Sequence, residues 1–219
     1  MTNDFDGKVV LITGAGKGKG RLLAEEFAKR GALVAVNDVS PVNLDGLVAQ
    51  SGGKIKAYVD DVAKKVAAQY IVKQVEDDFG RIDILINHAA VEPHIALLDM
   101  DEWDWHRVLD VNLTGVFLMM QSAGRMMRAK GSGVMINLIS ARLLEVQNEA
   151  AFNASMAGLV ALTRSAANEL SSFGIRVHIV GTGIAEFHQA DASVPSDFVG
   201  AVMYLCRSSL NGQIVNVEG

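Results

Sequence analysis

The chain has 219 residues, a net charge of −5 and 50% hydrophobic residues. This length suits a single domain over residues 1–219 with a large core, and the composition excludes a disordered chain. The scattered, slightly acidic charge excludes a nucleic-acid partner, and no apolar run approaches the length of a membrane span. Two features predict a cytoplasmic protein. The chain has one cysteine, Cys206, and its residues 1–8 are polar and lack the apolar core of a signal peptide.

Short apolar runs alternate with longer helical patterns along the whole chain. Continuous apolar strands that are each followed by a helix are typical of a parallel sheet covered on both faces. The sequence therefore predicts an α/β fold, a single Rossmann-like doubly wound domain with about seven parallel strands. The expected strands are Val9–Ile12, Leu33–Val36, Ile55–Val59, Ile82–Ile86, Val134–Ile139, Ile175–Val180 and Gln213–Val217. The expected helices are about Gly20–Arg30, Ala63–Phe79, Met100–Ala129, Ala150–Phe173 and Ser196–Arg207.

A glycine-rich segment, residues 13–20 (TGAGKGKG), joins the first expected strand to the first expected helix. Glycine is needed where the backbone turns tightly and approaches a pyrophosphate, and the helix N-terminus behind such a loop favours anions. Asp38 follows at the end of the second strand, about twenty residues on, where a carboxylate binds an adenosine ribose and repels a 2′-phosphate. The alternative is a glycine-rich turn that only lets the helix pack closely on the strand.

Two lysines in this loop leave its role open. Lys19 stands where such a loop usually carries an apolar residue that faces the cofactor, and its ammonium must reach water or an anion. Lys17 and Lys19 could hold phosphates more tightly, or they could fill the nicotinamide end of the pocket. The sequence alone does not choose between these two roles.

Motifs spread over almost the whole chain resemble those of the short-chain dehydrogenase/reductase family. The loop matches that family's Thr-Gly-x-x-x-Gly-x-Gly, Asp61-Val62 resembles its adenine-contacting pair, and Asn87-His88-Ala89-Ala90 occupies its Asn-Asn-Ala-Gly position. Asn112 and Ser140 match two members of its catalytic tetrad. The resemblance implies that NAD is the possible cofactor. The residues it implies for cofactor binding are Gly14, Lys17, Gly18, Lys19, Gly20, Asp38, Asp61, Val62 and Asn87.

The chain departs from this family where the family's Tyr-x-x-x-Lys should stand, because Phe152 and Met156 occupy the two positions. Neither side chain can donate a proton or carry a charge. Hydride transfer to or from a carbonyl carbon needs a proton at its oxygen, and a placed donor contributes about 10²–10⁴ in rate. No catalytic set is therefore intact, and Asn112 and Ser140 remain as remnants. As an apolar pair at i and i+4, the two replacements are equally ordinary on a buried helix face.

Further departures surround the same place. His178 replaces an Asn of the family, Thr182 replaces a Pro, and the segment from Gly183 to the next helix is short for a loop that closes over substrate. His88 and His94, with Glu92 between them, lie on one loop after the fourth strand. Their spacing fits no zinc pattern, so no metal site is expected.

These features predict a catalytically silent subunit, a pseudoenzyme that resembles the non-catalytic partner in heteromeric short-chain dehydrogenases. The expected partner is an active homologue in an NAD-dependent alcohol or hydroxyacyl dehydrogenase complex, held through the Met-rich helix Met100–Ala129 and the helix Ala150–Phe173. Two alternatives remain open. One is an active NAD(H)-dependent oxidoreductase with an atypical proton donor, such as Ser140 with water or a histidine. The other is a dinucleotide-binding sensor that switches a partner.

Overall fold

The computed structural model describes residues 3–140, 148–184, 187 and 189–217. Strands and helices alternate along the chain, and the strands form one parallel sheet in the order β3-β2-β1-β4-β5-β6-β7. The predicted doubly wound α/β fold is therefore confirmed. The elements are β1 (Val9–Thr13), α1 (Gly18–Lys29), β2 (Leu33–Asp38), α2 (Val42–Ala49), β3 (Ile55–Val59), α3 (Lys65–Phe79), β4 (Ile84–Asn87), α4 (Glu102–Leu109), η1 (Asp110–Gly115), α5 (Val116–Lys130), β5 (Gly133–Ser140), α6 (Ala150–Ser171), β6 (Ile175–Thr182), α7 (Phe198–Arg207) and β7 (Ile214–Asn216).

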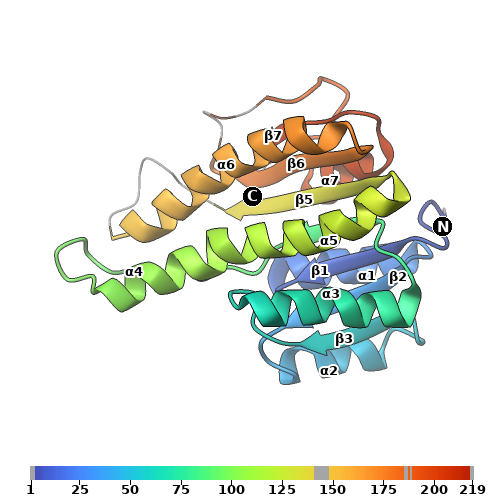
Figure 1. The fold of residues 1–219 in the computed structure, drawn as a ribbon, viewed down its shortest axis with the longest axis horizontal. Helices are drawn as coiled ribbons and strands as arrows, with labels where there is room; N and C mark the ends of the chain where they lie inside the picture. The colour runs from blue at the N-terminus through green and yellow to red at the C-terminus, as the bar shows by residue number, and fades with distance from the viewer. Residues whose placement is uncertain (1–2, 141–147, 185–186, 188, 218–219) are drawn as a thin grey trace.

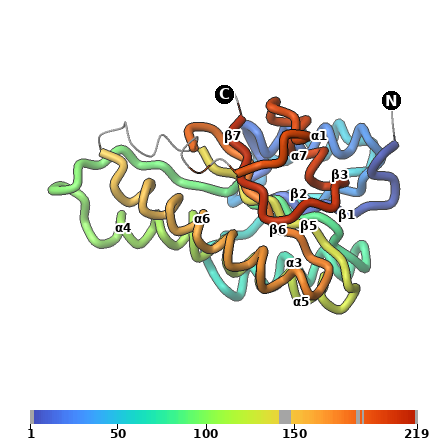
Figure 2. The backbone as a smooth tube through the Cα atoms, turned by 90° about the horizontal axis from the view of Figure 1, so that it is seen from above, coloured from blue at the N-terminus to red at the C-terminus, as the bar shows by residue number. Residues whose placement is uncertain are grey.

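Helices cover both faces of the sheet, with α3, α5 and α6 on one side and α1, α2 and α7 on the other (Figures 1 and 2). Each side has its own apolar core, because successive strand residues point to opposite faces. In β1, Val9 and Leu11 join the core under α3, α5 and α6, whereas Val10 and Ile12 join the core under α1 and α7. Burial on both faces explains why the strands read as unbroken apolar runs.

The parallel register gathers polar residues at one edge of the sheet. Thr13 is paired with Asn37, Asn87 with Asn137, and Ser140 with Thr182, all at the carboxyl ends of their strands. The sheet order reverses between β1 and β4, and this switch point is where ligands bind in open α/β sheets. The fold thus places the candidate site residues around one crevice.

The structure differs from the sequence prediction in two helices. The sequence pattern missed α2, Val42–Ala49, because the helix is short and contains Gly46. The helix predicted as one unit at Met100–Ala129 is three: α4, the π-helical η1, and α5. The wide turn of η1 contains Asn112, whose side chain bonds to the neighbouring loop, and such π segments are frequent at functional sites.

Helix α4 and the start of α6 extend beyond the carboxyl edge of the sheet (Figure 1). Here they lie beside the loop that follows β4, so these three segments form one wall of the crevice. Within the described part of the chain, every helix is too short or too polar to cross a bilayer.

Candidate functional site

The glycine loop forms a backbone cradle between β1 and α1. Gly14 has φ of +63°, and a Cβ there would lie 2.6 Å from Cα of Ala89, so only glycine fits. The N–H of Gly16 donates to Oδ2 of Asp38 at 3.0 Å. At the start of α1, the N-cap residue Lys17 makes no capping bond with its side chain, which leaves N–H groups of the first turn available. This arrangement suits a phosphate.

A cavity of about 250 Å³ lies beside the cradle and is called the adenosine-side cavity below. It brings together five residues that the sequence predicts for cofactor binding: Gly14, Lys17, Asp38, Asp61 and Val62. Asp38 is buried, and its Oδ1 accepts from the N–H of Ser40 at 3.1 Å, so the carboxylate is held in place. These groups come from the ends of β1, β2 and β3, which the sheet aligns.

A second cavity of about 630 Å³, called the catalytic cavity below, contains Ser140, Phe152 and Met156 among its lining residues. The structure therefore brings the remnant serine and the two substituted positions together. Phe152 and Met156 are only 3% and 2% exposed, and both belong to the apolar core under α5 and α6. The hydroxyl of Ser140 has only the hydroxyl of Thr182, 3.5 Å away, as a hydrogen-bonding neighbour among the described side chains.

The two loop lysines take different positions. Lys17 lines both cavities, whereas Lys19 lines only the catalytic cavity. The ammonium of Lys19 lies 4.9 Å from the ring centroid of Phe198 at the start of α7, a cation–π contact. Burial lowers the pKa of Lys19 from its ordinary value. The two cavities share lining residues and together form one groove, called the cofactor groove below. Lys19 lies at its catalytic end rather than at its adenosine end.

Asn112 does not line either cavity, because all of its side chain is engaged elsewhere. It is 1% exposed, its Oδ1 accepts from the N–H of Val91 at 2.8 Å, and its Nδ2 donates to the Val91 carbonyl at 2.9 Å. Nδ2 also donates to Oγ of Ser155 at 3.1 Å. Asn112 therefore fixes the loop after β4 against η1 and α6.

His88 lies where the two cavities approach each other, whereas the preceding residue, Asn87, lines neither cavity. Nδ2 of Asn87 donates to Oδ1 of Asn137 at 2.8 Å, while its own Oδ1 is buried without a partner among the described residues. The ring of His88 borders both cavities, and its Nδ1 lies 2.8 Å from the Gly14 carbonyl. Burial is the main cause that lowers the pKa of His88, and the lysine charges nearby act in the same direction.

Residues 8–196 match the family model for short chain dehydrogenases. The chain belongs to the short-chain dehydrogenase family. An uncharacterized oxidoreductase of Thermotoga maritima is 40% identical over 187 residues, which cover 84% of this chain and 74% of the relative. The (2S)-[(R)-hydroxy(phenyl)methyl]succinyl-CoA dehydrogenase subunit BbsD of Thauera aromatica is 36% identical over 81% of this chain and 73% of that protein. The crystal structure of an NAD+-bound xylitol dehydrogenase, 28% identical, covers 98% of both chains with a TM-score of 0.86.

Membership of the short-chain dehydrogenase family makes this chain a relative of oxidoreductases. One residue that departs from the family pattern, His178, lies in the core of the fold and not at either cavity. His178 on β6 is fully buried and lines neither cavity. Burial, with the nearby charge of Arg176, lowers the pKa of His178 to about 3. Its Nδ1 accepts from the N–H of Gln213 at 3.3 Å, and its Nε2 has no partner among the described residues.

Sequence reasoning missed two side chains of the cofactor groove. Arg107 on α4 lines both cavities and donates to Oδ2 of Asp61 at 3.1 Å. Phe198 covers Lys19. Neither lies near a recognisable motif, and only the fold brings them to the cofactor groove. In the short segment after Gly183, residues 185–186 and 188 lie outside the described residues, and Gln189 pairs with Ile214 at the sheet edge.

Proposed function

We propose that this chain is a non-catalytic subunit of an NAD-dependent alcohol or hydroxyacyl dehydrogenase, paired with an active homologous subunit. The observation that carries the proposal is the pair Phe152 and Met156 in the catalytic cavity, where the family has its proton donor and the cation that tunes it. A free phenol has a pKa of about 10, so the family's tyrosine needs its lysine. This chain retains neither group, and the hydroxyl of Ser140 is a poor substitute.

The cofactor groove fits a dinucleotide better at one end than at the other. At the adenosine end, the cradle around Gly14, the buried carboxylate of Asp38 and the free N–H groups of α1 suit a pyrophosphate and a ribose diol. At the other end, the apolar side chains of Phe152 and Met156 offer the nicotinamide ribose no charged hydrogen bond. A bound nicotinamide would carry the hydride of such a reaction, but Phe152 and Met156 give this chain no proton donor to complete its transfer. An NAD+-bound relative with nearly full coverage supports the choice of cofactor.

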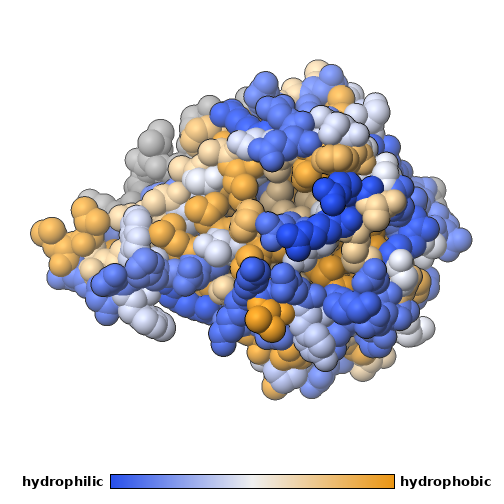
Figure 3. Space-filling view, in the orientation of Figure 1, coloured by the Kyte–Doolittle hydropathy of each residue, from blue (hydrophilic) through white to orange (hydrophobic). Residues whose placement is uncertain are grey.

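Helices α5 and α6 offer a surface for the partner. A groove of about 320 Å³ between them is bordered by Phe117 and Phe173, which are 43% and 39% exposed. Apolar side chains are interspersed along these helices on the face seen in Figure 3. The relative from Thauera aromatica is itself named as a subunit, which supports a function within a larger enzyme.

The test separates catalysis from assembly. We expect the isolated chain to bind NAD+ in calorimetry and to produce no NADH from xylitol or D-threitol, alcohols named for two relatives. The complex isolated from the source organism should give two kinds of chain in native mass spectrometry, the second with an intact Tyr-x-x-x-Lys. Normal alcohol oxidation by the isolated chain would refute the proposal.

An atypical proton donor is the second candidate, and one observation favours it. Lys19 carries an amine with a lowered pKa into the same cavity as Ser140. Turnover by the isolated chain that is lost in both Lys19→Met and Ser140→Ala would establish this alternative. A sensor function would instead require NAD+ to change the affinity of the chain for its partner, with no turnover by the complex.

A further inference from the structure

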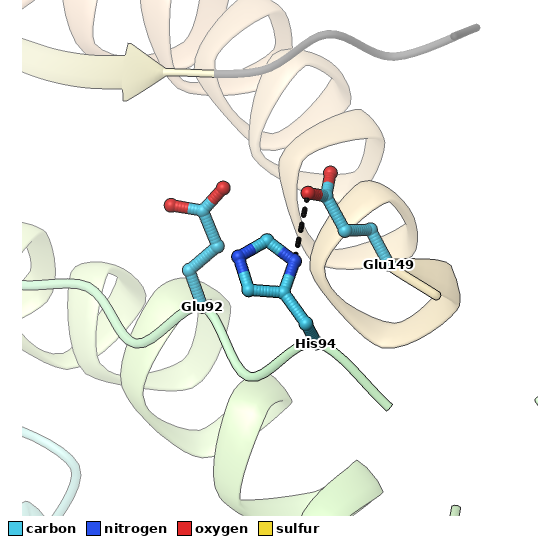
Figure 4. Close-up of side chains that lie close together, drawn as sticks. All are labelled: Glu92, His94 and Glu149. Atoms are coloured by element: carbon cyan, nitrogen blue, oxygen red, sulfur yellow. Dashed lines mark ion pairs between the residues drawn. The ribbon is translucent and has the colours of Figure 1, made fainter. Parts of the chain in front are cut away.

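Three side chains that could ligate a metal lie together beside the catalytic cavity, which one of them, Glu92, lines (Figure 4). Glu92 and His94 lie on the loop after β4, and Glu149 immediately precedes α6. One ligand atom from each lies within 4.8 Å of the other two. The imidazole lies between the two carboxylate side chains, with Nδ1 at 3.2 Å from Oε1 of Glu149.

Glu149 is the unusual member of the cluster. Its side chain is 4% exposed, and a buried carboxylate is unfavourable unless a charge compensates it. It occupies the N-cap position of α6 yet makes no capping bond, so the carboxylate turns away from the free N–H groups of the helix. It points instead to His94, which is 64% exposed and compensates a carboxylate only when protonated. A divalent cation would compensate Glu92 and Glu149 together.

The two segments that carry the ligands are joined by their backbones. The N–H of Ile95 donates to the carbonyl of Asn148 at 2.9 Å, directly beside His94 on one segment and Glu149 on the other. This bond fixes the spacing of the two segments without help from a metal. The ligands in a zinc site lie about 2.0–2.2 Å from the ion. A small movement of Glu92, which is exposed, would therefore complete the site.

We propose that Glu92, His94 and Glu149 form a binding site for a divalent first-row cation, with Zn²⁺ as the best fit. One imidazole nitrogen and two carboxylate oxygens are the donors that Zn²⁺ and Mn²⁺ accept, whereas Cu⁺ prefers sulfur and Mg²⁺ and Ca²⁺ prefer oxygen alone. Two carboxylates also neutralise the charge of the ion. Three protein ligands leave a coordination position open, as in catalytic zinc sites.

The location gives the ion a role independent of the missing tyrosine and lysine. Glu92 lines the catalytic cavity together with Phe152, and Glu149 lies one turn before Phe152 on the chain. A bound cation would tie the loop after β4 to the start of α6 and fix the position of Glu92 at the cavity wall. Its open position would accept an oxygen atom of a ligand in the cavity. The sequence predicted no metal site, because the spacing of His88, Glu92 and His94 fits no zinc pattern. Glu149 is distant from these residues in the sequence and joins Glu92 and His94 only in the folded chain.

Calorimetry with ZnCl₂ on the chelator-treated full chain, free of any affinity tag, tests the proposal. We expect one Zn²⁺ per chain, and at least a tenfold loss of affinity in each of Glu92→Gln, His94→Gln and Glu149→Gln. The exposed pair Glu102 and His106 on α4, 3.4 Å apart, provides the matched control, and Glu102→Gln and His106→Gln should leave the affinity unchanged.

Co²⁺ absorption gives a second readout that reports the ligands directly. The visible bands of bound Co²⁺ should change when His94 is replaced, and not when His106 is replaced. Glu92 is exposed, so Glu92→Gln should fold normally even if Glu149→Gln does not. Absence of Zn²⁺ and Mn²⁺ binding to the wild-type chain at millimolar concentration would overturn the proposal. Binding that is undiminished in both Glu92→Gln and His94→Gln would overturn it as well.

Discussion

The two ends of the cofactor groove contrast in how they use polar side chains. At the adenosine end, Asp38 and Asp61 are fixed by bonds to Gly16, Ser40 and Arg107, so their carboxylates are held beside the cavity. At the catalytic end, the positions that should carry a phenol and an ammonium are apolar and nearly fully buried. The two ends are therefore separable in this fold, because the ends of β1, β2 and β3 supply the adenosine end and α6 supplies the two substituted positions.

The substituted end has not collapsed. Phe152 and Met156 pack into the apolar core with their neighbours, yet they still border a cavity of about 630 Å³. The apolar side chains at these two positions therefore leave the cavity open beside them. The comparison predicts that each end can be changed without destroying the other.

The largest effect is expected from restoring the family's pair. In the double variant Phe152→Tyr with Met156→Lys, we expect NAD+-dependent oxidation of xylitol or D-threitol to exceed that of the wild-type chain by about 10²-fold, the lower range for a placed proton donor. Steady-state NADH formation measures this. Each single variant is the control and should gain far less, since the two residues act as a unit. A double variant that binds NAD+ and stays inactive would show that the cavity no longer positions a substrate.

The second largest effect concerns the opposite end. Gly14→Val should weaken NAD+ binding about 100-fold, because a Cβ would meet Ala89 at 2.6 Å and φ of +63° is strained for a branched side chain. Calorimetry measures the affinity, and urea unfolding shows whether the chain still folds. Gly46→Ala is the control: its Cβ would have Arg21 as nearest neighbour at 3.9 Å, so binding should be unchanged and α2 slightly more stable. Equal NAD+ affinity in wild type and Gly14→Val would mean that the cradle does not bind the cofactor.

Much of this contrast was predictable from the sequence, and the reasons differ between the two ends. The strands, the glycine loop and Asp38 depend on local patterns, so the seven-stranded sheet was predicted correctly. Helix α2 and the π-helical turn at Asn112 were not, because a short helix with a glycine and a locally widened turn leave no periodic signal. Arg107 and Glu149 join their sites only through tertiary contacts, which no spacing in the chain encodes.

A smaller effect should follow from removing the buried carboxylate at the adenosine end. Asp38→Asn should narrow the preference for NAD+ over NADP+ by about tenfold, because the charge that repels a 2′-phosphate is lost. The ratio of the two dissociation constants, measured by calorimetry, reports it. Asp45→Asn, an exposed substitution on α2, is the matched control and should leave the ratio unchanged. If Asp38→Asn leaves the ratio unaltered, the carboxylate serves only to hold Gly16 and Ser40.

The smallest effect concerns His178, a departure from the family that lies outside both cavities. His178 is buried and neutral, with a pKa of about 3, whereas an unfolded histidine has a pKa of about 6.5. Between these values the unfolded chain binds a proton that the folded chain does not. Protonation of His178 should therefore leave the free energy of unfolding unaffected above pH 6.5 and lower it as the pH falls toward 3.

Urea unfolding from pH 8 to pH 5 measures this dependence. His178→Asn should flatten it while leaving stability at pH 8 within about 1 kcal/mol of wild type, because one unpaired buried N–H is replaced by an amide that does not titrate. His106→Asn, at an exposed site on α4, should not change the slope. An unchanged slope in His178→Asn would assign the acid sensitivity to other groups. A flattened slope would identify His178 as the residue that sets this pH dependence of stability.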